Sequence, residues 1–259
     1  MTYSSQIVNS AARYFVGAWT FVFFWLPALA QERPSSAPLT ADEVMQRVVQ
    51  MNELRAKAID NYSSIRTYHL ESRGLSHEVA DIVVRVEYKA PNKKEFTIMS
   101  ESGSGTAQQR VFKKLLEAEQ QSLEDDNQRR SAVTPENYTF RLLTYSRTEA
   151  DEFYILDAQP RKTTQFLFQG RIWIDGSDFA ITRVEGEPAV NPSWWTLRTD
   201  LKRTYQKVDH FWLPESNKST TKVRIFGTAD LIIKYGEYRI NEASGEKLGL
   251  SLEAQSAAP

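Results

Sequence analysis

Apolar residues recur at two different spacings along this chain, and the two spacings predict two kinds of element. Over residues 41–61 they recur every three or four positions, which predicts one amphipathic helix. Thr40 and Glu43 have the spacing of a capping box, so this helix is expected to begin directly after Thr40. A second region of helical spacing covers residues 107–126, and the charged residues 124–130 are interpreted as a solvated loop that ends it.

Most of the remaining chain alternates apolar and polar residues, which is the period of β-strands. The predicted strands cover residues 65–74, 79–89 and 95–101 before the second helix, and 138–147, 151–159, 164–175, 178–187, 196–209, 211–223 and 228–240 after it. Because no helix separates the later strands, they are expected to pair antiparallel. About ten strands do not stay flat and open. The predicted fold is therefore mainly β with helices (α+β), a highly curved antiparallel sheet that forms a half-open β-barrel.

Residues 1–30 have the three-part layout of a secretory signal peptide. A polar start with Arg13 precedes an apolar run over residues 15–29, and Ala-Leu-Ala at 28–30 is a small-residue cleavage pattern. The run has about 15 residues, fewer than the roughly 20 that a membrane-spanning helix needs. The chain is therefore expected to reach the periplasm through a cleavable signal peptide. The remaining parts are then a flexible leader over 31–40, a folded domain over 41–241 and a disordered tail over 242–259.

Composition and charge exclude several classes of function. The chain has no cysteine, which excludes disulfides, thiol nucleophiles and zinc sites with cysteine ligands. Of the 32 Lys and Arg residues one is Arg13, so 31 basic residues face 33 acidic ones after residue 30, a net charge of −2. This near-neutral balance argues against a nucleic acid as partner, because phosphate binding needs a basic surface.

No pattern of catalytic or metal-binding residues stands out. The three histidines are not in ligand spacing, so neither a metal nor a cofactor is expected. The chain also has no P-loop, dinucleotide fingerprint or nucleophile elbow, which favours a protein that is not an enzyme. One enzymatic alternative stays open, a hydrolase site built from acids on strands such as Asp157, Asp175 and Asp178.

Aromatic side chains give the remaining signal for a binding site. They make up 12% of the chain, more than a plain soluble domain needs. A concave sheet face that helices cover only in part leaves an apolar cavity, which is the expected shape of a lipid site. Period two places Phe166 and Phe168 on one face and Trp173 near the opposite face unless a bulge intervenes. The candidate cavity residues are Tyr68, Val84, Val86, Phe96, Phe166, Phe168, Trp173, Trp195 and Trp212.

Several segments resemble outer-membrane lipoprotein-sorting proteins of the LolA/LolB-like superfamily. These segments are residues 170–175 (Gly-Arg-Ile-Trp-Ile-Asp), 178–188, 205–208, 211–214 and 231–235. The likeness covers about residues 41–241 and is greatest to a larger branch of the superfamily with an inserted helix, here residues 110–119. The resemblance implies an unclosed β-barrel with a helical lid and an apolar cavity that holds the acyl chains of lipoproteins or other lipids.

The resemblance also implies roles for particular positions. Gly103, Gly105, Phe112 and Leu116 are the candidate hinge or lid residues. In the lipoprotein chaperone of the superfamily, an arginine before a Pro-Asn pair helps to govern hold and release of the lipoprotein. Here Ala90 stands before the Pro-Asn pair, so the role of that arginine is not carried over to this chain.

Two functions follow as predictions. The first is a periplasmic carrier and chaperone, a monomer, that binds lipid or lipoprotein acyl chains and takes part in sorting lipoproteins to the outer membrane. Its partners are then an inner-membrane donor and an outer-membrane acceptor. The alternative is an envelope-stress sensor or regulatory binding module that contacts a membrane protein.

Overall fold

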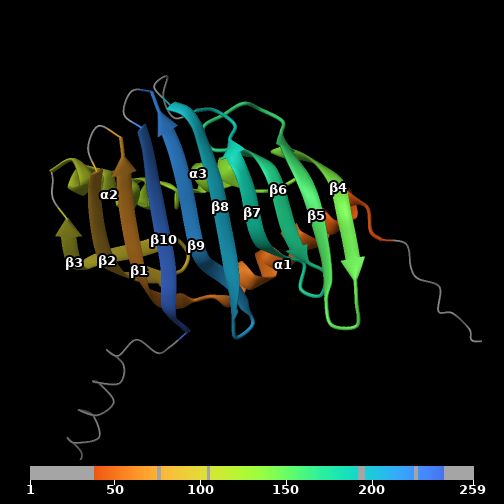
Figure 1. Cartoon of the computed structure of the whole chain (residues 1–259). Helices are drawn as coiled ribbons and strands as arrows, with labels where there is room; N and C mark the ends of the chain where they lie inside the picture. The colour runs from red at the N-terminus through yellow and green to blue at the C-terminus, as the bar shows by residue number, and fades with distance from the viewer. Residues whose placement is uncertain (1–37, 75–76, 104–105, 192–195, 225–226, 242–259) are drawn as a thin grey trace, which may run out of the picture. The chain divides into compact units, whose positions relative to one another are not determined.

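A computed structural model describes residues 38–74, 77–103, 106–191, 196–224 and 227–241 of the chain. Ten antiparallel strands form one sheet in the order β3-β2-β1-β10-β9-β8-β7-β6-β5-β4 (Figure 1). The strands are β1 (Asn61–Arg73), β2 (His77–Lys89), β3 (Lys93–Gly103), β4 (Tyr138–Arg147), β5 (Glu152–Pro160), β6 (Phe168–Asp175), β7 (Ala180–Pro188), β8 (Thr196–Val208), β9 (Phe211–Val223) and β10 (Gly227–Ile240). Since β3 and β4 are the two edges, the sheet is not closed.

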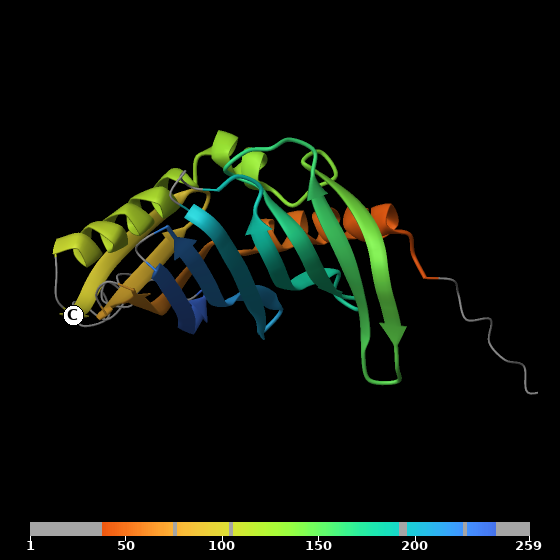
Figure 2. The ribbon, with the colours of Figure 1, turned by 45° about the horizontal axis from the view of Figure 1, so that its top comes forward.

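Three helices lie on one face of this curved sheet, as Figures 1 and 2 show. They are α1 (Ala41–Ala58), α2 (Thr106–Gln121) and α3 (Asp125–Ser131). This face is called the helix-covered face below, and the other is the open face. The prediction of a mainly β, antiparallel and unclosed curved sheet with few helices is therefore confirmed.

The first helix begins where the capping box predicts. The Thr40 hydroxyl accepts a hydrogen bond from the Glu43 backbone N–H at 3.3 Å, and the Glu43 carboxylate accepts one from the Thr40 backbone N–H at 2.8 Å. These two bonds satisfy N–H groups that would otherwise have no partner at the helix start. The apolar side of α1 then buries Val44, Met45 and Val48 completely against the sheet. The helix ends at Ala58, three residues before the predicted end.

The segment after α2 differs from the prediction. Residues 124–130 were expected to be a loop, and this is wrong because α3 covers residues 125–131. Asp125 and Asp126 lie in the first turn of α3 and Arg129 and Arg130 in the last, which is the charge distribution that the helix dipole favours. The apolar period does not reveal α3 because this helix buries no side chain.

The strand boundaries lie within two residues of the predicted ranges except at the starts of β1 and β6. The strand β1 was predicted to begin at residue 65, but it begins at Asn61. The strand β6 was predicted to begin at residue 164, but it begins at Phe168. A turn precedes it, in which the Leu167 backbone N–H donates to the Thr164 carbonyl at 3.3 Å. Leu167 is buried in that turn, so an apolar residue outside the sheet extended the predicted strand.

The apolar core is divided into two clusters along the helix-covered face. The first cluster packs α1 against β4 to β7 and includes Leu156, Ile172 and Ile174, all fully buried. The second packs Phe112 of α2 against β1, β2 and β10, around Tyr68 and the fully buried Val84 and Val86. Among the residues that the structure describes, β8 and β9 contribute no buried side chain to either cluster. The two clusters therefore lie on either side of β8 and β9, whose buried residues Thr196, Thr199 and Leu213 belong to neither.

Two glycines provide a test of how closely the strands pack. A Cβ atom at Gly186 would meet the backbone carbonyl of Gln169 on β6 far inside van der Waals distance, whereas a Cβ at Gly236 would meet nothing within 4 Å. Gly186→Ala is therefore expected to lower the free energy of unfolding by about 2 kcal/mol. Gly236→Ala is the control, and it should leave that free energy unchanged or raise it by about 0.5 kcal/mol. Urea unfolding of the two variants measures the difference, and equal values would contradict the predicted close packing.

Candidate functional site

A small pocket lies between the end of α1 and strands β7 to β9, on the helix-covered face. Its volume is about 260 Å³, and its lining is Asn52, Arg55, Ala56, Ile59, Ala180, Ile181, Tyr205, Phe211 and Trp212. Most of these side chains are apolar or aromatic, and only those of Asn52 and Arg55 carry strong polar groups. An apolar concave pocket with a few polar groups at its border is the usual form of a small-molecule site. It is called the aromatic pocket below.

Asp178 connects the elements that form the aromatic pocket. Its carboxylate accepts hydrogen bonds from Lys207 Nζ at 2.5 Å and from Trp212 Nε1 at 2.8 Å. Its backbone carbonyl accepts a bond from Arg55 of α1. The hydrogen bond from Lys207 and, less strongly, that from Trp212 lower the pKa of Asp178, although partial burial opposes them. Asp178 therefore stays charged and holds the indole of Trp212 in one orientation at the pocket wall.

The three acids of the hydrolase alternative have local structural contacts. Asp175 accepts bonds from the backbone N–H groups of Ser177 and Asp178 at 3.0 and 2.7 Å, which stabilises the turn between β6 and β7. Asp157 forms an ion pair with Arg141 at 3.4 Å. In the register of β5 and β6, Asp175 lies opposite Phe153. Four residues along β5 separate Phe153 from Asp157, which is about 13 Å. The register thus separates Asp157 from the other two acids.

The predicted cavity residues are distributed over several places. Tyr68, Val84 and Val86 lie in the second core cluster, and Phe96 packs against it. Phe168 packs against the first cluster, and the ring of Phe166 lies under the Arg130 guanidinium at 4.2 Å. Of the candidate hinge or lid residues, Gly103 ends β3, while Phe112 and Leu116 of α2 contact the second cluster. Trp195 and Gly105 lie outside the described residues.

The two described tryptophans of the candidate set lie on different faces. Trp212 forms part of the aromatic pocket. Trp173 alternates with the buried Ile172 and Ile174, so its side chain points to the open face, where the Arg183 guanidinium lies 4.5 Å from its ring. Of the candidate cavity residues, the structure thus places Trp212 at this pocket and Trp173 away from the helix-covered face.

A buried polar cluster beneath α2 was not predicted from the sequence. Arg66 of β1 is only 3% exposed, and its Nη1 donates to both carboxylate oxygens of Glu119 on α2 at 2.8 and 2.7 Å. Lys94 of β3 donates to the same carboxylate at 2.8 Å. The Arg66 guanidinium also lies 4.8 Å from the ring of Tyr235. One signal in the sequence could have revealed it. Arg66 lies two residues before Tyr68 on β1, so both side chains point to the same inward face.

Ionisation of this buried cluster depends on the pairing of its charges. Burial opposes the charged form of Glu119, but the charges of Arg66 and Lys94 outweigh burial and lower the pKa of this carboxyl group. Burial likewise opposes the charge of Arg66, and the carboxylate of Glu119 outweighs it, so the pKa of Arg66 is raised. Burial raises the pKa of Tyr235 to about 12. At neutral pH the cluster therefore contains two cations, one anion and neutral phenols.

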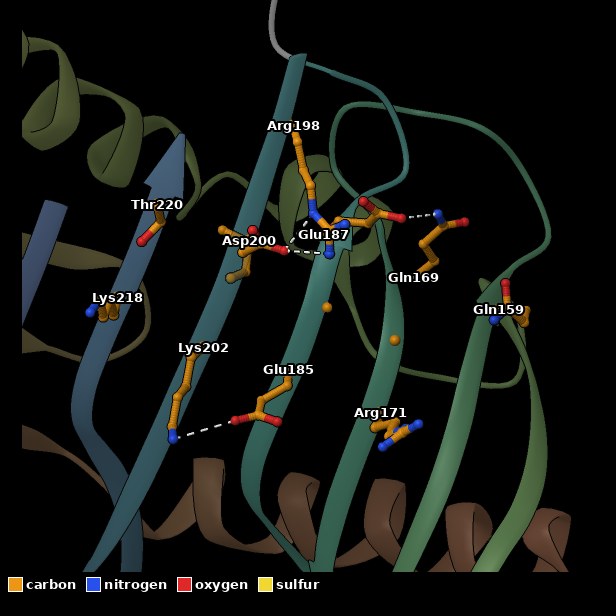
Figure 3. Close-up of a pocket in the computed structure, with 13 residues that line it drawn as sticks. Gln159, Gln169, Arg171, Glu185, Glu187, Arg198, Asp200, Lys202, Lys218 and Thr220 are labelled. Atoms are coloured by element: carbon orange, nitrogen blue, oxygen red, sulfur yellow. Dashed lines mark hydrogen bonds and ion pairs between the residues drawn. The ribbon is translucent and has the colours of Figure 1, made fainter. Parts of the chain in front are cut away.

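A second, larger depression lies on the open face over β5 to β9. Its volume is about 670 Å³, and Figure 3 shows α1 behind the strands that form it. Paired ions and amides surround it, with Lys202 Nζ 3.4 Å from Glu185, Arg198 Nη2 2.7 Å from Asp200, and a bond of 2.8 Å from Gln169 to Glu187. Exposed ion pairs of this kind contribute little free energy. The aromatic pocket is therefore the better candidate for an apolar ligand.

Two further findings concern metals and membranes. Within the described ranges, no group of three or more His, Cys, Asp or Glu side chains is arranged to hold a metal ion. None of the described helices is both long and apolar enough to cross a membrane.

The chain belongs to a family of unknown function, DUF5686, whose model matches residues 44–236. A comparison with curated proteins finds no match.

Several solved structures are similar in fold. One is a DUF1329 family protein from Desulfovibrio piger, 12% identical, with 80% of this chain and 96% of that chain covered and a TM-score of 0.40. A LolA superfamily protein from Nitrosomonas europaea is 8% identical over 81% and 97% of the two chains, with a TM-score of 0.37. A domain from Vibrio parahaemolyticus described as an outer membrane lipoprotein-sorting protein is 13% identical over 80% and 96%, with a TM-score of 0.39.

LolA-superfamily and lipoprotein-sorting proteins, which the sequence resembles, are among these solved structures. Identities of 8–13% say nothing about the ligand or the reaction. The function of this chain is therefore argued below from its own residues.

Proposed function

We propose that the chain is a carrier in the periplasm, without enzymatic activity, that binds the acyl chain of a lipid or lipoprotein on the helix-covered face of its sheet. The observation that carries this proposal is the aromatic pocket between α1 and β7 to β9. Tyr205, Phe211 and Trp212 present broad apolar surfaces there, and a hydrogen bond to Asp178 holds the indole of Trp212 in place. The predicted signal peptide supports the location, and the sequence resemblance of residues 170–175 and 178–188 to lipoprotein-sorting proteins supports the class of ligand.

The pocket alone is smaller than the roughly 300 Å³ at which small-molecule sites begin. We therefore place the rest of the acyl chain along the centre of the sheet, over β8 and β9. These two strands contribute no buried side chain to either core cluster. Burial of about ten methylene groups contributes roughly 8 kcal/mol. That free energy corresponds to a dissociation constant of about 1 μM before the costs of association are subtracted.

Native mass spectrometry tests the proposal. The chain is secreted into a bacterial periplasm, purified without detergent and measured before and after extraction with organic solvent. We expect an added mass in the range of a lipid or lipopeptide that disappears on extraction, because a hydrophobic ligand dissociates into the solvent. The extracted species identifies the class of cargo. A protein that shows only its own mass, even after incubation with envelope lipids and lipopeptides, would contradict the carrier function.

The alternative of an envelope-stress sensor predicts a different result of the same experiment. A sensor that contacts a membrane protein would co-purify with a protein partner and carry no extractable lipid. Detergent-solubilised membranes passed over the immobilised chain provide this second measurement. A membrane protein retained by the lipid-free chain would favour the sensor over the carrier.

A further inference from the structure

Three buried polar atoms on β1 have no hydrogen-bond partner in the part of the chain that the structure describes. They are Ser64 Oγ, Arg66 Nε and the Tyr68 hydroxyl, and their residues are 1%, 3% and 2% exposed. Positions 64, 66 and 68 alternate along one strand, so all three side chains are on the helix-covered face, beneath α2. An unpaired buried polar group destabilises a fold, so three together on one short segment require an explanation.

The charge of the surrounding cluster indicates what is missing. Arg66 and Lys94 carry two positive charges, and the carboxylate of Glu119 supplies one negative charge to both. One positive charge therefore remains uncompensated within the cluster, and a buried charge is stabilised only when it is paired. The donors left over, Arg66 Nε and the Ser64 and Tyr68 hydroxyls, can all bind an anionic oxygen.

The strand register joins this cluster to the aromatic pocket. Tyr205 lies opposite Pro214 on β9, and Arg66 lies opposite Tyr235 on β10. The Gln206 side chain donates to the backbone carbonyls of both Pro214 and Tyr235, at 3.4 and 3.2 Å, and so connects β8, β9 and β10 at the same level of the sheet. Three strand spacings separate Tyr205 from Arg66, which is about 14 Å. An extended dodecyl chain has about this length.

We propose that the cluster of Ser64, Arg66, Tyr68 and Lys94 is the binding site for the anionic head group, a carboxylate or a phosphate, of the acylated ligand. The Glu119 carboxylate occupies this site when no ligand is bound. The tail of the ligand then extends from Arg66 across β10 and β9 to the aromatic pocket. This inference rests on the proposed acyl-chain carrier and adds the chemical class of the head group.

The test compares ligands that share one chain and differ in their head group. Isothermal titration calorimetry of the purified chain uses dodecanoate, dodecyl phosphate, dodecan-1-ol and inorganic phosphate. The two anionic dodecyl ligands are expected to bind about tenfold more tightly than dodecan-1-ol, because charge-assisted hydrogen bonds form only with an anion. Inorganic phosphate is expected to show no binding, since it has no chain to bury.

Glu119→Gln provides the decisive variant, because its effect has the opposite sign to that of a structural defect. Removal of the competing carboxylate is expected to tighten binding of dodecanoate and dodecyl phosphate by at least about fivefold and to leave dodecan-1-ol unchanged. Glu117→Gln is the matched control, since Glu117 lies on the same helix with its side chain 56% exposed. The control should bind all four ligands as the wild type does.

The outcomes separate this inference from the function on which it rests. Equal affinity for dodecanoate and dodecan-1-ol would be consistent with the carrier function but would overturn the anion site. Binding of anions by Glu119→Gln that is no tighter than that of the wild type would also overturn the anion site. Inorganic phosphate that binds as strongly as dodecyl phosphate would show an anion site to which the acyl chain adds nothing, and would overturn its role as a head-group site. Absence of binding by every dodecyl ligand would refute the carrier itself.

Discussion

Leu156→Ala is expected to lower the free energy of unfolding by about 3 kcal/mol. Leu156 is fully buried on β5 and belongs to the first core cluster, in which α1 packs against the sheet. Its neighbours Ile172 and Ile174 lie on β6, which is hydrogen-bonded to β5. They therefore cannot move to fill the space that the leucine side chain leaves. The lost burial and the new cavity both contribute to the loss of stability.

Leu197→Ala is the control for this prediction. Leu197 also lies on a strand, β8, but it is 53% exposed. Its replacement is expected to change the free energy of unfolding by less than about 0.5 kcal/mol. Urea unfolding followed by far-UV circular dichroism compares the two variants under the same conditions. Similar losses in both would show that Leu156 does not lie in the core described above.

Ala56→Trp is expected to weaken binding of an acyl chain by more than about tenfold, or about 1.4 kcal/mol. Ala56 is an exposed residue of α1 that lines the aromatic pocket, so a large side chain at this position occupies the space proposed for the ligand. Because Ala56 belongs to neither core cluster, the free energy of unfolding should stay close to that of the wild type. Titration of dodecanoate into the variant measures the change.

Leu54→Trp introduces the same side chain on the other side of the same helix. Leu54 is 53% exposed and lies two residues before Ala56, which places it about 200° around the helix axis from Ala56. This variant should bind dodecanoate with the affinity of the wild type. If Ala56→Trp binds equally well, the ligand does not enter the aromatic pocket and the proposed site is wrong.

The fold could be predicted largely because its local signals agree with its tertiary structure. The alternating residues of β2 and β9 gave strand limits close to those observed, and the capping box at Thr40 marked the start of α1. The failures have local causes. α3 is stabilised by charges at its two ends rather than by an apolar side, and Leu167 is an apolar residue in a turn.

The candidate site could be predicted only in part. Trp212 was predicted and lies at the aromatic pocket, but period two alone does not tell which face of a strand will be covered by helices. The Arg66–Glu119 pair joins residues 53 positions apart in the chain. Nothing local in the sequence indicates such a pairing, since it depends on how α2 packs over β1. The pairing becomes visible only when the sheet and its helices are in place.

Quenching of Trp212 fluorescence by a brominated acyl chain tests whether an acyl chain enters the aromatic pocket. Dibrominated stearate quenches a tryptophan only in close contact, so the purified chain is titrated with it alongside Trp212→Phe and Trp173→Phe. We expect strong quenching in the wild type and in Trp173→Phe, whose replaced residue lies on the open face beside Arg183. The Trp212→Phe variant should lose most of the quenched signal. Quenching that persists in Trp212→Phe and disappears in Trp173→Phe would contradict an acyl-chain site on the helix-covered face.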